Sequence, residues 1–360
     1  MRHHDCIIIG GGLMGLLTAH ELISEGLKVC LLERGVLGRE SSWAGGGILS
    51  FLHPWSAKDT LVPLSDWSRD HYPGLTKRLY AESDIDCEYL RSGMLVLKPE
   101  NPGAITDWAT HTNRPAQDLS KAEMVALEPN LGPAWEFGTL LADIAQIRNP
   151  RLIKALSTSL KARGLEIHEH TEVREIQQGS HGNVLLKTRS ETIEAERVVV
   201  TSGAWSGRLL AMAGVDSEVE PVRGQMLLYK SEPDVLKQIL LHGDRYMIPR
   251  KDGHILMGST VEYEGFDKST THDVAEVLRE EAAAMLPTLS ALQPIAHWAG
   301  LRPGTLDGVP KIGPVPGFDG LFVNMGHLRN GVFLGPASAR LMVDLMLGHE
   351  PICDPAPYQI

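Results

Sequence analysis

The chain has 360 residues, 43% of them hydrophobic and 22% charged, which is typical of a globular protein long enough for two domains. Its formal net charge of -11 disfavours nucleic acid and anionic membranes as main partners. The four cysteines form no C-x-x-C pair, so we expect free thiols in a reducing cytosol. No stretch approaches the roughly 20 apolar residues of a membrane span. We therefore predict a cytoplasmic protein that binds neither nucleic acid nor membrane.

The first 35 residues predict a strand, a helix and a second strand. The apolar run "CIIIG", Cys6 to Gly10, suits a strand that is buried on both faces of a parallel sheet. From Leu13 onward the apolar residues have helical spacing, and Gly26 is a plausible helix stop. The run "KVCLLE", residues 28–33, is then the second strand. A βαβ unit therefore closes within this short segment.

Three glycines lie between the first strand and the helix. Gly10 permits the tight turn, Gly12 lets the backbone approach a pyrophosphate, and Gly15 lets the helix pack close to the strand. The phosphates then lie at the positive end of the helix. Glu33 ends the second strand, where a carboxylate can hold both ribose hydroxyls. This arrangement predicts a bound dinucleotide, but the motif alone does not separate NAD from FAD.

The next segments alternate between loop, helix and strand. The stretch "SSWAGGGIL", Ser41 to Leu49, is too rich in glycine for a helix or an ordinary strand. Its small residues let backbone amides come close to a ligand. We expect a helix over 61–82 and a strand over 93–99. A short helix is capped by Ser120 and stops before Pro129.

The middle of the chain is expected to return to the nucleotide domain. Residues 149–164 predict an amphipathic helix, with Asn149 as its cap and Pro150 as its first residue. An alternating strand is expected over 165–178. The apolar run in "ERVVVTSGAWS" then ends at Ser202 in another turn of small residues.

From Pro221 onward the pattern changes to longer strands of antiparallel character. The sequence Lys251–Gly253 is a hairpin signal between two of them. Residues 273–286 predict a helix. The chain then ends with an apolar strand, a turn that contains glycine, and a closing helix over 321–348. These patterns indicate a second domain built on an antiparallel sheet.

Two arginines lie beside glycine or proline in apolar surroundings. Arg302 is in "HWAGLRPGTLDGVPKIGPV" and Arg329 is in "GHLRNGVFLGP". An arginine without a close acidic neighbour is expensive to bury and usually pairs with an anion. Its guanidinium fork matches a carboxylate with two hydrogen bonds. A structural salt bridge to a distant Asp or Glu remains the alternative for each of them.

The remaining histidines are not expected to bind a metal. In "HEH", His168 to His170, alternate strand residues on one exposed face explain the pattern, although such residues can also be metal ligands. His3 and His4 are expected to be solvated. We therefore predict no metal site.

Seven motifs together resemble a known family of flavoproteins. They are "CIIIGGGLMG", "ERG", "SSWAGGG", "VVVTSGAWS", "DRYMIPRKDG", "WAGLRPGTLDGVPKIGPV" and "GHLRNGVFLGPA". The sequence is similar to the D-amino-acid oxidase-type FAD-dependent oxidoreductases, and among them to those that oxidise glycine. The nucleotide loop occurs in many flavoproteins, whereas the pair of motifs "GLRPGT" and "GHxRNG" is specific to a much smaller group of them. The motifs extend over nearly the whole chain.

The resemblance implies FAD, and because no cysteine is placed to anchor the flavin we expect it to bind noncovalently. Transfer of a hydride to the flavin N5 needs no strong protein base when the amine arrives neutral, so we expect no catalytic base. Arg302 would pair with the substrate carboxylate, and Tyr246 and Arg329 would line the same site. The family often has Met where Ile48 stands, which bears on the shape of the pocket. The cofactor-binding residues implied in this way are Gly10, Gly12, Leu13, Met14, Gly15, Glu33, Arg34, Ser41, Ser42, Gly46, Gly47, Ile48, Val173, His327, Leu328, Arg329, Asn330, Gly331, Val332 and Phe333.

The predicted fold class is α/β, α+β overall. A Rossmann-like FAD-binding domain is joined to a second domain built on an antiparallel β-sheet flanked by helices. The FAD-binding domain is discontinuous and is expected to comprise residues 1–85, 149–220 and 300–360. The substrate-binding domain is expected to comprise residues 86–148 and 221–299.

The implied activity is oxidative deamination of glycine, and of sarcosine and small D-amino acids, to the imine and then the oxo acid. For glycine the products are glyoxylate, ammonia and hydrogen peroxide, with O2 as the electron acceptor. A role in thiamine (thiazole) biosynthesis and a homotetramer are implied as well. Three alternatives remain open. They are a D-amino-acid or secondary-amine dehydrogenase with a non-oxygen acceptor, an FAD-binding protein without turnover, and an NAD-dependent dehydrogenase.

Overall fold

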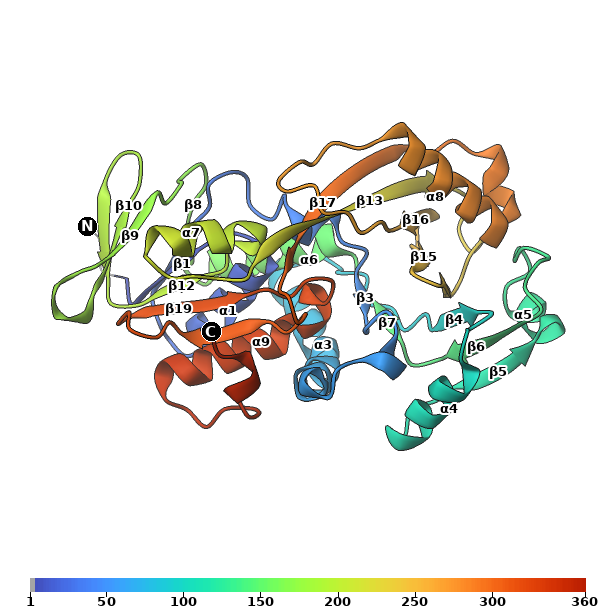
Figure 1. Ribbon diagram of the computed structural model, residues 1–360, viewed down its shortest axis with the longest axis horizontal. Coiled ribbons are helices and arrows are strands. Elements are labelled where there is room, and N and C mark those ends of the chain that lie inside the picture. Colours follow the sequence, from blue (N-terminus) through green and yellow to red (C-terminus); the bar gives the residue numbers. More distant parts are fainter. Residues whose placement is uncertain (1–3) are drawn as a thin grey trace.

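Two large β-sheets organise the chain, one toward each end of the molecule, with helices packed around them (Figure 1). The structure is a computed structural model that describes residues 4–360. The strands are β1 Cys6–Ile9, β2 Val29–Leu32, β3 Ile48–Leu49, β4 Met94–Leu97, β5 Gln117–Ser120, β6 Phe137–Leu141, β7 Ala145–Gln146, β8 Glu166–His168, β9 Glu175–Gln178, β10 Val184–Lys187, β11 Thr192–Ala195, β12 Val198–Val200, β13 Glu220–Lys230, β14 Ile239–His242, β15 Arg245–Pro249, β16 His254–Gly258, β17 Ala296–Gly304, β18 Lys311–Pro314 and β19 Leu321–Met325. The helices are α1 Leu13–Ser24, α2 Ser41–Ala44, α3 Val62–Ser83, α4 Pro102–His111, α5 Lys121–Leu127, α6 Asn149–Ala162, α7 Ser206–Met212, α8 His272–Met285 and α9 Gly331–Leu347.

The first sheet has six strands in the order β18-β19-β12-β1-β2-β8, and all pairs except β18–β19 are parallel. Its central strands β1, β2 and β12 are buried along their whole length, as the apolar run of β1 predicts, whereas the edge strands β8 and β18 are partly exposed. Cys6 and Ile8 pack toward the helices α1, α6 and α9, whereas Ile7 and Ile9 join a second cluster with the small sheet β9–β10–β11. This double burial explains why β1 is a continuous apolar run rather than an alternating one.

The β1–α1 turn brings backbone against backbone. Gly10 has φ +114°, a conformation that L side chains rarely adopt. A Cβ at Gly15 would lie 2.1 Å from the Gly10 carbonyl oxygen, so only glycine lets α1 approach the strand this closely. The predicted roles of these two glycines in the turn and in helix packing therefore agree with the structure.

The second sheet has eight strands in the order β17-β13-β16-β15-β14-β4-β6-β5. All of its pairs are antiparallel except β14–β4. Apolar residues of α8, such as Leu278 and Met285, pack against one face, and Ile105 of α4 packs against the other. The predicted antiparallel sheet flanked by helices is therefore present, and the predicted fold class is confirmed.

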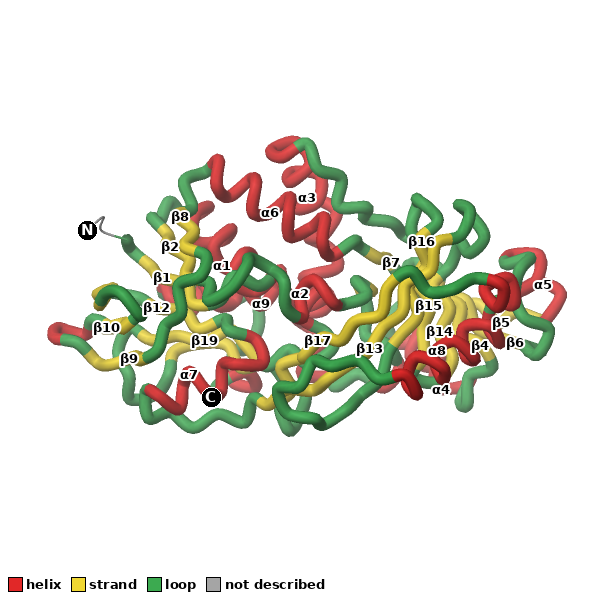
Figure 2. The backbone as a smooth tube through the Cα atoms, turned by 90° about the horizontal axis from the view of Figure 1, so that it is seen from above, coloured by secondary structure: helices red, strands yellow, loops and turns green. Residues whose placement is uncertain are grey.

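The strands β13 and β17 are the longest and pair along almost their whole length, from Glu220↔Gly304 to Leu228↔Ala296. Figures 1 and 2 both show them running from the middle of the molecule into the second sheet. The division of the chain into domains stays a prediction. Its boundaries at 220/221 and 299/300 fall within these two strands.

Three local predictions were wrong. Residues 41–49 are not all loop, because Ser41–Ala44 form α2, where Trp43 packs on Trp298, and β3 pairs with β7. The expected strand over 165–178 is split, because the chain turns at His170 (φ 57°) and its two ends join different sheets. Asn149 is not a cap but lies inside α6, since its side chain donates to the Gly45 carbonyl (3.0 Å).

The sequence analysis also made predictions about the N-terminal histidines, membrane spans and metal sites. His3 lies outside the described residues. His4 was expected to be solvated, but it is partly buried and contacts Glu166 (Nε2–Oε2 3.1 Å). Among residues 4–360, no helix combines the length and the apolar character needed to cross a membrane. The same residues contain no group of three or more potential metal ligands.

Gly15→Ala is expected to lower the free energy of unfolding by about 1–3 kcal/mol, because the new methyl group overpacks the turn. Denaturant titration measures it. Gly74→Ala is the matched control, because Gly74 lies inside α3 with open space at its Cβ position. That control should be neutral or stabilise by up to about 1 kcal/mol. Equal effects of the two substitutions would contradict the close-approach argument.

Candidate active site

One cavity of about 420 Å³ joins the two parts of the molecule that the sequence analysis singled out. At one end it is lined by the β1–α1 turn and the end of β2. At the other end it is lined by side chains of β13, β15 and β17. The middle is lined by the glycines after α2 and by the turn before α9. The cavity therefore connects a nucleotide-type turn with a partly buried arginine, Arg302.

The nucleotide end presents a fixed carboxylate. Glu33 accepts a hydrogen bond from the Gly11 amide at Oε2 and another from the Gly35 amide at Oε1, both at 2.7 Å. Ser42 Oγ accepts from the Leu13 amide (2.8 Å), which ties α2 to the start of α1. A carboxylate held in place at a strand end, beside bare glycine backbone and a helix N-terminus, fits the ribose and pyrophosphate of a dinucleotide.

The middle of the cavity depends on a buried arginine behind it. Arg250 Nη2 donates to the Gly46 carbonyl (2.6 Å), and its Nη1 donates to Gln146 Oε1 (2.7 Å) and to the Ile147 carbonyl (3.1 Å). Burial lowers the pKa of Arg250 to about 10, so it stays protonated at neutral pH. Gly47 has φ +80°, and a Cβ there would lie 2.0 Å from the Ile147 carbonyl oxygen. The glycine loop after α2 is therefore held in place by one buried cation, the Arg250 guanidinium, whose hydrogen-bond acceptors are all neutral.

The other end of the cavity contains Arg302. Its Nη2 donates to Ser259 Oγ (2.7 Å), and its Nη1 donates to the backbone carbonyls of Thr260 (3.0 Å) and Arg223 (3.3 Å). Within residues 4–360, no carboxylate lies within salt-bridge distance of Arg302. Burial lowers the pKa of this guanidinium. Within residues 4–360, Arg302 is thus a partly buried cation that bonds only neutral acceptors, and it fits a ligand carboxylate.

Arg329, unlike Arg302, is paired with a carboxylate of the protein. Its Nη1 contacts Asp244 Oδ1 at 3.1 Å, and His53 Nε2 lies 3.5 Å from the same oxygen. The salt-bridge alternative therefore describes Arg329 but not Arg302. Tyr246 lies between the loop and the arginine, because its hydroxyl donates to Ser259 Oγ (3.1 Å) and its ring lies against Gly46.

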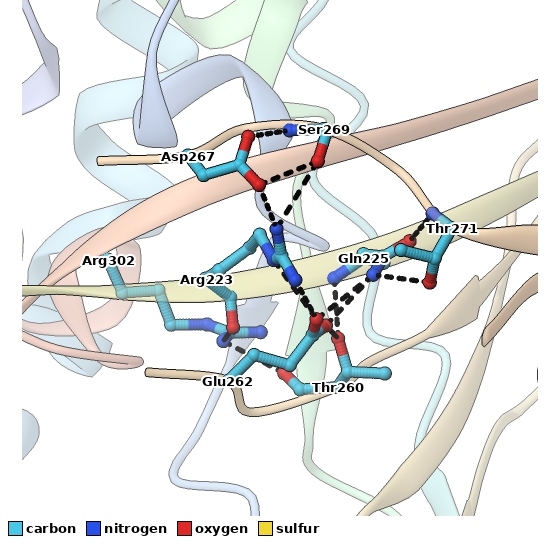
Figure 3. A network of polar contacts seen from close by, with 8 residues as sticks. All are labelled: Arg223, Gln225, Thr260, Glu262, Asp267, Ser269, Thr271 and Arg302. Atoms are coloured by element: carbon cyan, nitrogen blue, oxygen red, sulfur yellow. Dashed lines mark hydrogen bonds and ion pairs between the residues drawn. The ribbon is translucent and has the colours of Figure 1, made fainter. Parts of the chain in front are cut away.

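A polar network behind Arg302 fixes its surroundings (Figure 3). Arg223 of β13 contacts Glu262 (Nη2–Oε2 2.6 Å) and Asp267 (Nη1–Oδ2 2.8 Å). Gln225 donates to Glu262 (3.0 Å), and Thr260 also bonds to that carboxylate. These contacts hold the segment after β16 against β13, on the side where Arg302 binds its backbone acceptors.

The cavity gathers most of the residues that the sequence predicted. Gly15 lies beneath the turn, and Phe333 packs on Phe51 (ring centroids 5.4 Å apart), so neither lines the cavity. The predicted residues that line it are Gly10, Gly12, Leu13, Met14, Glu33, Arg34, Ser41, Ser42, Gly46, Gly47, Ile48, Val173, Tyr246, Arg302, His327, Leu328, Arg329, Asn330, Gly331 and Val332.

Two of these residues have surroundings that the sequence did not reveal. Val173 follows the end of β8 and lies outside any strand, contrary to the expected strand over 165–178. His327 is fully buried, with Nε2 at 3.0 Å from Ser338 Oγ. Burial lowers the pKa of His327 to about 3, so this imidazole is neutral at physiological pH.

Several lining or supporting residues were missed. Ser259, Met226 and Arg208 line the cavity, and Arg250 supports its middle from behind. A small polar residue directly after the apolar strand β16 was a usable signal for Ser259. The partners of Arg250 lie more than 100 positions away in the sequence, so no local pattern marks it.

Comparison with known proteins agrees with this geometry. The sequence pattern of the FAD dependent oxidoreductase (DAO) family matches residues 5–345. The chain belongs to this family. Among curated family relatives, it is 48% identical to glycine oxidase of Pseudomonas aeruginosa over 353 residues, which cover 98% of this chain and 97% of that one. It is 32% identical to glycine oxidase of Geobacillus kaustophilus over 368 residues, covering 100% and 97%.

Solved structures agree as well. The crystal structure of glycine oxidase from Geobacillus kaustophilus superposes with a TM-score of 0.95 at 30% identity, covering 100% of this chain and 98% of that one. Iminodiacetate oxidase from Chelativorans sp. BNC1 has a TM-score of 0.89 at 22% identity, covering 98% of each chain, which shows a shared fold.

These matches confirm FAD as the cofactor and a flavoprotein amino-acid oxidase as the enzyme class. They remove the NAD-dependent alternative and the alternative without turnover. All four cysteines carry free thiols. Within residues 4–360, no cysteine lines the cavity, and noncovalent attachment of FAD stays a prediction.

Arg250→Met is expected to weaken FAD binding by the apoprotein about tenfold or more and to lower the free energy of unfolding by about 1–3 kcal/mol. The reason is that the Gly46 and Ile147 carbonyls lose their buried donor. Flavin-fluorescence titration and denaturant unfolding measure the two effects. Arg91→Met, at an exposed arginine that bonds Tyr89, is the control and should change neither. Unchanged FAD affinity in Arg250→Met would refute the supporting role.

Proposed function

We propose that this enzyme oxidises glycine, and also sarcosine and small D-amino acids, to the imine, which hydrolyses to the oxo acid. For glycine the products are glyoxylate and ammonia, and O2 is reduced to hydrogen peroxide. The observation that carries this proposal is the partly buried Arg302, which within residues 4–360 bonds only neutral acceptors and lies in the same cavity as the nucleotide turn. Similarity to proteins named glycine oxidase supports the choice of substrate.

The chain's own contribution to the reaction is positioning. Arg302 binds the substrate carboxylate through its guanidinium fork, and the Tyr246 hydroxyl lies on the same side of the cavity. FAD, when bound, supplies the hydride acceptor for the α C–H bond and the route for electrons to O2. Apolar side chains such as Met226 and Val332 exclude water from the space between. No protein base is needed if the amine arrives neutral.

We propose that the cofactor is held along the cavity by residues of four segments. Glu33 would hold the adenosine ribose, and the backbone of Gly12 to Met14 with Ser41 and Ser42 would bind the pyrophosphate. Gly46, Gly47 and Ile48 would run along the flavin ring. Val173 would meet the adenine through its backbone, and the segment 327–333 would close over the flavin end.

Further parts of the proposal concern the setting of the reaction. Its product would serve thiamine (thiazole) biosynthesis. The similarity to a bifunctional ThiO/ThiG protein of Trichormus variabilis, 30% identical over 349 residues, 95% of this chain and 52% of that one, supports this. The cytoplasmic location and the homotetramer stay predictions, and light scattering of the purified protein measures the latter.

The decisive experiment mixes the purified flavoprotein with glycine under anaerobic conditions, follows the visible flavin band, and then admits air. Bleaching followed by rapid recovery with peroxide is the expected result. Bleaching without recovery in air would favour the dehydrogenase with another electron acceptor. Failure of glycine, sarcosine and every small D-amino acid to bleach the flavin would rule out amine oxidation.

Arg302→Leu is expected to lower kcat/KM for glycine by about 100-fold or more while the protein keeps its bound flavin. The reason is the loss of two charge-assisted hydrogen bonds to the substrate, each worth about 1.5–3 kcal/mol. Steady-state peroxide production measures kcat/KM, and the visible spectrum of the purified variant shows whether the flavin is still bound. Arg329→Leu should have a smaller effect, because Arg329 is already paired with Asp244. If Arg329→Leu lowered kcat/KM more than Arg302→Leu, the substrate carboxylate would be assigned to Arg329 instead.

A further inference from the structure

We propose that Ser259 is an additional substrate-binding residue, whose hydroxyl donates a hydrogen bond to the substrate carboxylate beside Arg302. This inference rests on the proposed function. Ser259 follows β16 directly and lines the cavity together with Tyr246 and Arg302. Its exposed fraction is only 3%, so its hydrogen bonds have to be satisfied inside the protein or by a ligand.

The hydrogen bonds recorded for this hydroxyl leave one position open. A serine hydroxyl has two acceptor lone pairs and one O–H donor. Arg302 Nη2 donates to Ser259 Oγ at 2.7 Å, and the Tyr246 hydroxyl donates to the same oxygen at 3.1 Å. Both lone pairs are thus taken. Among residues 4–360, no acceptor is recorded for the Ser259 O–H, so this donor is left for a ligand in the cavity.

The chemistry around this O–H identifies the kind of acceptor. Arg302 supplies a partly buried positive charge directly beside it, and the other acceptors of that guanidinium are the Thr260 and Arg223 carbonyls. A cation with neutral partners next to a free donor favours a ligand group that carries negative charge and several acceptor lone pairs. A carboxylate meets both conditions, since it can accept from the guanidinium and from the hydroxyl at once.

The segment that carries Ser259 is held from both sides. The backbones of Arg223 and Glu262 exchange two hydrogen bonds (2.8 and 3.0 Å), and the Gln225 amide donates to Thr260 Oγ1 (2.8 Å). The ion pairs of Arg223 with Glu262 and Asp267 reinforce this attachment (Figure 3). The Ser259 carbonyl also accepts from Arg245 Nη1 at 2.8 Å. The donor is therefore positioned before any substrate arrives, which lowers the entropy lost on binding.

A small carboxylate that is not oxidised tests this inference separately from turnover. Acetate is titrated into the flavin-containing enzyme, and its Kd is measured from the change in flavin absorbance. Ser259→Ala is expected to raise the acetate Kd about five- to tenfold, because one neutral donor to a charged acceptor is lost. Ser259→Cys, which keeps a weak donor at the same position, should give an intermediate Kd.

Ser269→Ala is the matched control, because Ser269 bonds Asp267 in the same polar network but does not line the cavity. It should leave the acetate Kd unchanged. An acetate Kd of Ser259→Ala equal to that of the unmodified enzyme would overturn the proposal. So would an equal rise in Ser269→Ala, because the effect would then belong to the network as a whole.

The outcomes also separate this inference from the proposed function. If acetate binds and depends on Ser259, but glycine does not reduce the flavin, the carboxylate site stands and the proposed reaction fails. If glycine reduces the flavin and acetate binding does not depend on Ser259, the reaction stands and this inference fails. If acetate leaves the flavin spectrum of the unmodified enzyme unchanged, the carboxylate site itself is refuted.

Discussion

The guanidinium of Arg302 is partly buried and bonds acceptors that carry no charge, and much of the surrounding structure serves to keep it there. An unpaired buried cation is unfavourable unless its donors are satisfied and an anion is available. Here the nearby carboxylate of Glu262 is engaged by Arg223 instead, and Arg223 is paired with Asp267 as well. The network therefore uses one arginine to occupy the acidic side chains and leaves the other for a ligand.

The long pair β13–β17 explains how this arginine comes to lie near a nucleotide turn. Arg302 lies near one end of the register, opposite Val222, and its acceptors lie on β13 and on the segment after β16. At the same end, Gly300 contacts Ala44 of α2. The side chain of Ser42, also in α2, accepts a hydrogen bond from the start of α1. The pairing of β13 with β17, together with the contact between Gly300 and α2, thus fixes where Arg302 lies relative to the nucleotide turn.

The sequence predicted the features whose causes are local. The βαβ unit, the capping of α5 by Ser120 and the hairpin between β15 and β16 depend on residues a few positions apart. The features that were missed depend on distant partners. Arg250 bonds Gly46 across 204 positions, and Asn149 leaves its expected cap position to bond Gly45 across 104. The turn at His170 was missed because a residue other than glycine adopts a positive φ there.

The same contrast applies to the two arginines, which the sequence could not tell apart. Both lie beside glycine or proline, but Asp244 lies 85 positions from Arg329 in sequence and beside it in space. One local signal for Arg302 did exist in β13. A Cβ at Gly224 would lie 2.2 Å from the Arg302 guanidinium, so glycine in the middle of this strand is required by the arginine that packs on it. A glycine in the interior of a strand often marks the close approach of another group. The site is therefore shaped by the lack of a side chain at Gly224 of β13 as much as by Arg302 of β17, because a side chain at Gly224 would displace the guanidinium that binds the substrate carboxylate.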